Sequence, residues 1–494
     1  MKKYLLPFLL LTLVFYASCS SLDYTETMRV PESLFYDGNY MQAAEALLPA
    51  INQKGKNQLL FMMECGYMLH AGGDYQKSNK VLLPAAEKAL VSTTSISKQA
   101  ASLLTNNSAL PYKGEDFEKV LIHMYLGINY FMLKDFENAV VEFKRVNEEL
   151  QKIKNESDGS ARYKQNIMAK YMTAKAYEAI GYANNDMDDI EFAYKELEQI
   201  YALNSNIGLV RADLQLLSKK LGYADDYAKW VWTFGKLENR PDNYGELVAI
   251  LQSGRCAIKK SRGTLLTDSA MNLAINVAAQ GVNLNQGITI GAVLATLAIA
   301  ENPIPYFEKQ SDLVKALKVT VNGQTFSTTA LEDISATAIQ NLEDDYTSLK
   351  SKVAVSVVLK AVAAVAAGEA AKAAANKLGS SGSLGNLLGT LLGSGTGMAL
   401  FSQMQPDLRS WRTLPAKLHV GRIFLPPGTY SANLAFVGAN GITDTKTVSV
   451  EIKANEITFI NERTLDASAY PKQESPVSAE TQASNFTKSD MQFK

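Results

Sequence analysis

A short turn motif recurs three times in the first third of the chain and constrains how that part can fold. In each copy an aromatic residue follows the turn, a small residue comes three positions later and a large apolar residue comes seven positions later. The turns are Gly38-Asn39-Tyr40, Gly73-Asp74-Tyr75 and Lys134-Asp135-Phe136. Gly66 and Gly127, which precede the last two turns, have no side chain to separate two helices. The pattern predicts pairs of antiparallel helices in close contact.

This spacing resembles the tetratricopeptide repeat (TPR), a helix-turn-helix unit of about 34 residues. The resemblance implies an α-solenoid over residues 25–222 that contacts peptides or proteins along its concave face. The side chains expected on that face are Leu60, Met63, Tyr67, His70, Met124, Ile128, Phe131, Met132 and Tyr171. A groove this apolar is either a binding site for a partner or is filled by another part of the same chain.

The first residues have the pattern of a lipoprotein signal peptide, residues 1–18. Lys2 and Lys3 precede an apolar stretch, Leu5 to Tyr16, and small residues then lead to Cys19. The resemblance to such signals implies cleavage before Cys19, acylation of that residue and anchoring in a membrane. No acidic residue follows Cys19 directly, which by the same resemblance favours the outer membrane, facing the periplasm. The alternative is an ordinary secretory signal with an incidental cysteine.

Composition excludes some partners. Without Lys2 and Lys3, the 49 basic residues fall to 47, against 50 acidic ones, so no strongly basic surface for nucleic acid is expected. Beyond Cys19 only Cys65 and Cys256 remain. A fold held together by disulfides is therefore excluded, although one bridge stays possible. Cys65 lies in an apolar helical segment and is expected in the core.

The remaining chain is expected to be rich in β-strands. Residues 223–330 include a strand over Gly245–Leu251 with Arg255–Lys260 as its return strand, an Asn322-Gly323 hairpin and an uncharged stretch from Ser269 to Ala300. Residues 406–464 alternate between apolar and polar in four runs, which predicts antiparallel strands in a small sandwich. Residues 465–494 have the composition of a disordered tail. The fold class is α+β: a TPR-like solenoid, then a β-rich sandwich-like domain with an inserted helical hairpin.

The inserted hairpin, residues 331–405, is rich in alanine and glycine. Its glycines recur every four residues, at Gly385, Gly389, Gly393 and Gly397. On a helix this spacing allows close helix packing, as in membrane helix pairs. One interpretation is a hairpin that inserts into a membrane or self-associates there; the other is a soluble hairpin or a flexible loop. Lys360, Glu369 and Lys372 favour the soluble alternative because charges at a membrane midplane are costly.

No enzyme signature is present in the sequence. The three histidines, His70, His123 and His419, do not form a metal-ligand spacing, and neither a P-loop nor a nucleophile elbow occurs. We therefore expect no catalysis, no metal and no cofactor. The cluster Arg409, Trp411 and Arg412 has two interpretations: it binds an anionic or glycan ligand, or an arginine stacks on the tryptophan and fixes the entry to the sheet.

Two stretches, Pro111–Val120 and Arg409–Pro415 with its continuation Leu425–Tyr430, resemble a family of bacterial TPR-containing lipoproteins. The resemblance covers most of the chain after Cys19 and implies a place in the cell envelope but no activity. A strand-like segment, Ala292–Pro305, lies in a longer uncharged stretch than this resemblance suggests. The predicted function is a protein-binding scaffold or adaptor. The alternatives are a membrane-inserting or pore-related assembly protein, which would use the glycine-spaced hairpin, and a glycan-binding cell-wall protein.

Overall fold

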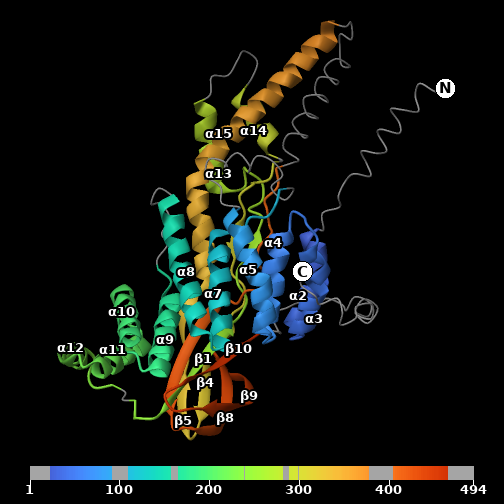
Figure 1. Cartoon of the computed structure of the whole chain (residues 1–494). Helices are drawn as coiled ribbons and strands as arrows, with labels where there is room; N and C mark the ends of the chain where they lie inside the picture. The colour runs from blue at the N-terminus through green and yellow to red at the C-terminus, as the bar shows by residue number, and fades with distance from the viewer. Residues whose placement is uncertain are drawn as a thin grey trace.

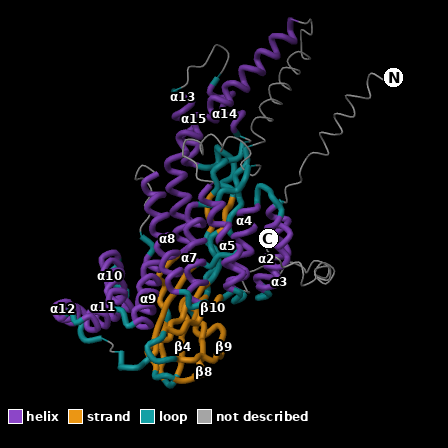
Figure 2. Tube along the Cα trace, viewed as in Figure 1, coloured by secondary structure: helices purple, strands orange, loops and turns teal. Residues whose placement is uncertain are grey.

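The computed structural model describes residues 23–91, 110–156, 165–237, 240–281, 289–298, 300–377 and 404–465. It has the predicted class: helix pairs of a TPR-like solenoid come first and a sheet-rich region follows (Figures 1 and 2). A long helix with two short helices beside it extends away from the sheets (Figure 1). Cys19, Gly385, Gly389, Gly393 and Gly397 lie outside the described residues.

The solenoid is built from helix pairs. Their bounds are α2 (Tyr24–Tyr36), α3 (Tyr40–Asn52), α4 (Gln58–Ala71), α5 (Tyr75–Val91), α7 (Asp116–Met132), α8 (Phe136–Glu156), α9 (Ile167–Asn184), α10 (Met187–Leu203), α11 (Gly208–Leu221) and α12 (Ala224–Phe234). The aromatic residues of the three predicted turns, Tyr40, Tyr75 and Phe136, are the first residues of α3, α5 and α8. The turn motif therefore located the start of the second helix in each of three pairs.

Glycine sets the closeness of the helix pairs, as predicted. A Cβ atom on Gly66 would lie 2.4 Å from the Leu82 side chain, and one on Gly127 would lie 2.5 Å from the Phe143 ring. The Ser78 hydroxyl also donates a hydrogen bond of 2.7 Å to the Gly66 carbonyl. In each pair the large apolar residue of the motif thus occupies the space that the missing side chain leaves.

Two four-stranded sheets form a sandwich beside the solenoid. The first has the order β10-β1-β7-β6 and the second β5-β4-β8-β9. The strand bounds are β1 (Gly245–Ser253), β4 (Val314–Val321), β5 (Gln324–Ser327), β6 (Thr329–Asp333), β7 (Lys417–Leu425), β8 (Gly428–Gly438), β9 (Gly441–Ile452) and β10 (Ile457–Arg463). Leu247 and Leu251 of β1 pack in the core between the sheets, together with Leu317 and Leu434.

The other face of the first sheet packs on the solenoid. Val248 and Ile250 of β1 and Leu418 and Val420 of β7 belong to the same apolar cluster as the inner helices. Because side chains alternate along a strand, even-numbered residues of β1 and β7 face the solenoid and odd-numbered ones face the second sheet. A strand buried on both faces is expected to be apolar throughout, which accounts for the unbroken sequence Leu247–Leu251.

Several predictions about the strands need correction. The segment Arg255–Lys260 is not the return strand of β1: its residues Ile258–Lys260 form β2, which pairs with β3 (Tyr306–Glu308). Instead, β1 pairs with β7 antiparallel and with β10 parallel, so the strands are not all antiparallel. Ala292–Pro305 begins within a helix, α14 (Ile290–Leu297), and not in a strand. The Asn322-Gly323 hairpin is confirmed between β4 and β5, with positive φ at both residues.

The projecting part consists of α15 (Ile334–Lys377) with α13 (Ser269–Gln280) and α14 packed against it (Figure 1). With 44 residues, α15 is about 66 Å long at 1.5 Å per residue. Met271 and Ile275 of α13 pack against Val353 and Val357 of α15 in a separate apolar cluster. Among the described residues, no helix combines the length and hydropathy needed to cross a bilayer.

The close helix approach at Gly127 can be tested by adding one methyl group. Gly127→Ala should lower the free energy of unfolding by about 1–3 kcal/mol, because the new Cβ overlaps the Phe143 ring and the pair must separate. Gly55→Ala is the control, since a Cβ there meets no atom within 4 Å. Urea denaturation followed by circular dichroism measures both. Equal stability of the two variants would contradict this account.

Candidate functional site

The inner face of the solenoid is the candidate site, and the chain itself occupies it. All the predicted groove residues except Met132, which is half-buried, have less than 2% of their surface exposed. Residues 407–416, here called the inner segment, pack against them together with β1 and β10. The Trp411 ring lies 6.2 Å from the Tyr67 ring, and Phe459 of β10 lies 4.7 Å from Phe131. The structure therefore agrees with the alternative in which another part of the chain fills the groove. The groove is not open at these residues.

Two buried carboxylates of the solenoid bind the main chain of the inner segment. Glu64 accepts hydrogen bonds from the Arg412 N–H at 2.7 Å and from the Thr413 hydroxyl at 2.5 Å. Glu118 accepts one from the Trp411 N–H at 2.6 Å. An extended segment without strand partners has main-chain donors that need acceptors when buried. The solenoid supplies these acceptors, as a receptor does for a bound peptide.

Burial raises the pKa of both carboxyl groups to about 7. For Glu64 the hydrogen bonds from Thr413, Tyr24 and Arg412 act in the opposite direction, and for Glu118 the neighbouring Glu115 raises the pKa further. Because both groups release their protons near pH 7 in the folded state but near pH 4.5 in the unfolded state, the free energy of unfolding depends on pH between these values.

The Arg-Trp cluster is part of this interface. Arg409 donates hydrogen bonds to Asn57 at 2.7 Å and to the Leu110 carbonyl at 3.1 Å, and its guanidinium lies 5.2 Å from the Tyr112 ring. The Arg412 guanidinium lies 5.0 Å from the Tyr24 ring. The arginines thus lie over tyrosines of the solenoid side, where the structural interpretation expected an arginine over Trp411. They contact other parts of the same chain, as that interpretation expected, but through different rings.

His70 lies in a buried polar network between the solenoid and β1. Its Nδ1 is 2.6 Å from the Asn129 side-chain oxygen, and its Nε2 is 2.7 Å from the Gln252 amide nitrogen. Since the oxygen only accepts and the amide donates, Nδ1 carries the proton and the ring is neutral. Burial lowers the pKa of His70 to about 4, which agrees with this assignment. Across the described parts of the chain, no cluster of His, Cys, Asp and Glu could hold a metal ion.

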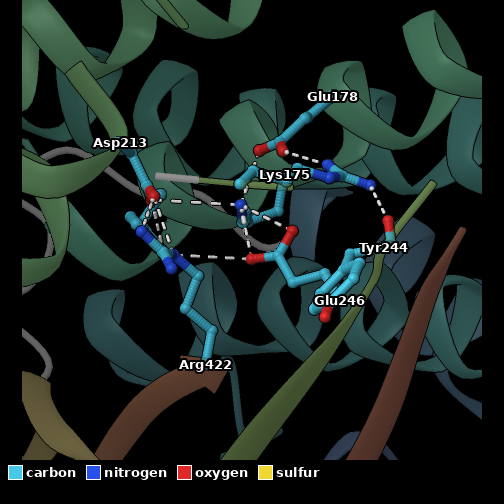
Figure 3. Close-up of polar contacts among 8 residues, drawn as sticks. Lys175, Glu178, Asp213, Tyr244, Glu246 and Arg422 are labelled. Carbon is cyan, nitrogen blue, oxygen red and sulfur yellow. Dashed lines mark hydrogen bonds and ion pairs between the residues drawn. The ribbon is translucent and has the colours of Figure 1, made fainter. Parts of the chain in front are cut away.

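A buried ionic network joins the solenoid to the first sheet (Figure 3). Lys175 of α9 lies 2.5 Å from Glu178, 2.8 Å from Glu246 of β1 and 3.9 Å from Asp213 of α11. Arg422 of β7 pairs with Asp213 at 2.5 Å. All five side chains have 5% or less of their surface exposed. Arg240, 3.3 Å from Glu178, adds a third positive charge against three carboxylates.

The network stabilises the ionised forms of Lys175 and Asp213, whereas burial and the neighbouring carboxylates Glu246 and Asp213 raise the pKa of Glu178. Burial by itself would lower the pKa of Lys175, but Asp213, Glu178 and Glu246 raise it well above the usual value. Burial would raise the pKa of Asp213, yet Arg422 and Lys175 hold it below its usual range. Tyr171, one of the predicted groove residues, donates a hydrogen bond of 2.8 Å to Asp213. The network therefore depends on both sides of the interface being present.

Sequence reasoning identified the aromatic and apolar lining but missed the charged residues that bind it to the rest of the chain. Glu64, Glu118, Asp213, Glu246 and Arg422 were not singled out. One signal was available: Glu64 is a lone charge in the apolar run Leu59–Leu69, and a charge there requires buried partners. The identity of those partners, hundreds of residues away, could not be inferred from that signal.

The two remaining cysteines are free and buried. Cys65 packs in the core, as expected, and its thiol lies 3.6 Å from the Ala44 carbonyl. Burial raises the pKa of both thiols to about 12, so neither is a reactive thiolate at neutral pH.

In comparisons with known proteins, no family model and no curated protein match the chain. Among solved structures, the chain is similar to the nearly identical TPR-like repeats of a kinesin light chain from Podosopora anserina, with 14% identity and a TM-score of 0.27. The similarity covers 42% of this chain and 91% of that one; a single-substitution variant of the same protein gives equal values. At this TM-score the similarity adds nothing to the fold, which rests on the contacts described above.

Lys175 is the central cation of the ionic network, and its removal tests the network. Lys175→Met should lower the free energy of unfolding by about 3–5 kcal/mol, because three buried carboxylates lose their common partner. Lys195→Met breaks an exposed pair with Glu191 and should change stability little. Urea denaturation of both variants measures the difference. A loss for Lys175→Met no greater than for the control would show that the network is dispensable.

The raised pKa of Glu64 predicts a pH dependence of stability. The folded state holds a proton on this group up to about pH 7, whereas the unfolded state releases it near pH 4.5. The contribution is therefore fully present below pH 4.5 and falls by up to about 3 kcal/mol as the pH rises to 7. Glu64→Gln, which cannot ionise, should remove that fall.

Urea denaturation of wild type and Glu64→Gln at pH 5 and pH 8 measures this difference. The comparison of the two proteins cancels the opposite contribution of His70 and His419, whose pKa values are lowered by burial to about 4. Identical pH dependence of the two proteins would contradict the assignment.

Proposed function

We propose that this protein is a cell-envelope lipoprotein, held at the outer membrane by acylated Cys19 and facing the periplasm, which acts as a non-enzymatic scaffold or adaptor for protein partners. The observation that carries the scaffold role is the exposure of Trp232, with 91% of its surface accessible, at one end of the TPR-like solenoid. The inner face is already in use, because Glu64 and Glu118 hold main-chain N–H groups of residues 411–412 and Trp411 packs on its aromatic residues.

Because the chain itself occupies the inner face of the solenoid, a protein partner needs another contact surface. A partner that entered the groove would have to displace the inner segment and the sheet attached to it, with its buried ion pairs. Contacts with other proteins are therefore assigned to the outer surface. The α10–α12 end of the solenoid exposes large apolar side chains: Phe192, Leu203 and, with 91% of its surface exposed, Trp232. Tryptophan is a frequent energetic centre of protein interfaces.

The non-enzymatic role is supported by the way the polar groups of the interior are used. The carboxylates of the ionic network neutralise Lys175, Arg422 and Arg240, and His70 is held neutral by two amides. A catalytic group needs access to a substrate and a protonation state matched to its task. Groups engaged with one another in a closed interface do not meet these conditions.

The proposal is tested in the native host by acylation and by crosslinking. With an alkyne fatty-acid probe, the wild-type protein should be labelled and Cys19→Ser should not be. Crosslinking with mass spectrometry should recover a partner whose yield falls at least about tenfold in Trp232→Ala, since an interface tryptophan contributes 2 kcal/mol or more.

Ile442→Ala, which removes an exposed apolar side chain of the sandwich, is the matched control and should leave the recovered partner unchanged. Absence of label on the wild-type protein would contradict the proposed lipid anchor at Cys19. Absence of any partner that depends on residues 24–234 would contradict the proposed scaffold role.

A further inference from the structure

The hydroxyl group of Tyr24 lies between two oxygen atoms, and the three residues concerned are buried. Its oxygen is 2.7 Å from Oε1 of Glu64 on α4 and 2.7 Å from the carbonyl oxygen of Ser410 in the inner segment. A carbonyl oxygen and an ionised carboxylate only accept hydrogen bonds, whereas a phenol has a single proton to donate. With Glu64 ionised, one of these two short contacts would therefore contain no proton.

A proton on Glu64 satisfies both contacts. The carboxyl group then donates to Tyr24, and Tyr24 donates to the Ser410 carbonyl. The other hydrogen bonds of Glu64 stay in place, because Oε1 still accepts from the Arg412 N–H and Oε2 from the hydroxyl and N–H of Thr413. The positions of these atoms therefore fit the protonated form of Glu64.

Glu118, the other carboxyl group that holds the inner segment, has a different arrangement. It accepts hydrogen bonds from the Tyr112 hydroxyl at 2.6 Å, the Glu115 N–H at 2.9 Å and the Trp411 N–H at 2.6 Å. Each of these donors brings a proton of its own, so the contacts are satisfied with Glu118 ionised. Of the two carboxyl groups, Glu64 is the one that needs a proton to complete its contacts with the inner segment.

The surroundings of Glu64 also favour the protonated form. Among the described residues, the charged or titratable groups that most affect it are Tyr24 and Glu32 of α2 and Arg412 of the inner segment; α3, α5 and α7, which also pack on α4, contribute none of comparable effect. The Arg412 guanidinium pairs with Glu32 at 3.5 Å, and Glu32 pairs with Arg255 at 3.4 Å. The hydrogen bonds described for Glu64 come from neutral groups, and a buried carboxylate without a bonded cation is costly.

We infer that the inner segment is held on the solenoid by a proton: protonated Glu64 donates to Tyr24, Tyr24 donates to Ser410, and loss of this proton loosens the segment at residues 410–413. Without the proton, Tyr24 serves one of its two acceptors and the other loses its hydrogen bond. At the same time a carboxylate is left in the interior, and opening of the segment gives it access to water. The inference concerns occupation of the inner face and does not depend on acylation of Cys19 or on the partner at Trp232.

The pH range of this effect follows from the pKa of Glu64, which burial raises to about 7 from 4.5. The folded segment holds the proton below pH 7, whereas a Glu64 side chain exposed by opening releases it near pH 4.5. The segment is therefore held most firmly on the acidic side. Between pH 6 and pH 8 the equilibrium constant for opening should rise about tenfold.

Hydrogen exchange under native conditions, followed by mass spectrometry, tests the inference on the full chain. After correction for the intrinsic dependence of exchange on pH, the amides of residues 411–413 should lose about tenfold in protection from pH 6 to pH 8. In Glu64→Gln, whose amide donates to Tyr24 but cannot ionise, this loss should be about tenfold smaller than in the wild type. The change with pH is compared and not the level of protection, because the amide also faces the Arg412 N–H. Glu26→Gln, which removes an exposed carboxylate of α2, is the matched control and should behave like the wild type.

The wild-type chain by itself tests where the proton acts. A loss of protection that is equally large in α9 to α11 would overturn the inference, because Glu64 would then affect the whole fold and not the inner segment. An equal change with pH in wild type and Glu64→Gln would overturn it too. Infrared difference spectra measure the proton directly: the carbonyl band of a protonated carboxyl group should be stronger in the wild type than in Glu64→Gln at pH 6, and this difference should decrease at pH 8. Absence of that difference at pH 6 would show that Glu64 is ionised and would contradict the assignment.

Discussion

The structure depends on one constraint: strands β1 and β7 are buried on both faces. Val248 and Ile250 contact the solenoid, while Leu247 and Leu251 contact the second sheet. Each strand thus contributes to two cores at once, and neither core closes without it. Burial of about 25 cal/mol per Å² of apolar surface on both sides of a strand makes the solenoid and the sandwich stabilise each other. The two parts therefore share one continuous core, although β7 and β10 follow the solenoid only after a long stretch of sequence.

A shared interface of this kind buries charges, and each buried charge needs a partner of opposite sign. The ionic network supplies such partners at the cost of desolvating six charges, a cost that the mutual attraction of Lys175, Asp213 and Arg422 only approximately offsets. We therefore expect the network to contribute more to specificity than to net stability. A shift of β7 by one residue would turn Arg422 to the other face and leave Asp213 without its guanidinium, so the network fixes the strand register relative to the helices.

The sequence predicted local features and failed on long-range ones, for a physical reason. The aromatic residue after each turn and the glycines Gly66 and Gly127 act within one helix pair, so their spacing reports a contact between neighbouring elements. The alternating runs likewise located the strands. By contrast, the parallel pairing of β1 with β10 and the contact of Glu64 with Arg412 join residues separated by hundreds of positions. No periodicity in the sequence indicates such a pairing. The lone charge of Glu64 in an apolar run indicated only that it has buried hydrogen-bond partners. The predicted pairing of β1 with Arg255–Lys260 was wrong for the same reason. A strand followed by a turn suggests that the next segment is its pairing partner, whereas β1 pairs with the distant strands β7 and β10.

Occupation of the inner face also changes where function should be sought. In an open solenoid the concave surface is the default contact site, but here its aromatic residues surround Trp411 and its carboxylates are used by main-chain N–H groups. What remains accessible differs in chemistry from one end of the molecule to the other. The outer helices α10 to α12 carry both signs of charge beside the exposed Trp232, whereas α13 contains no charged residue and exposes Leu273 and Val277. The two accessible ends therefore differ in chemistry, and the 44 residues of α15 extend one of them away from the sheets (Figure 1).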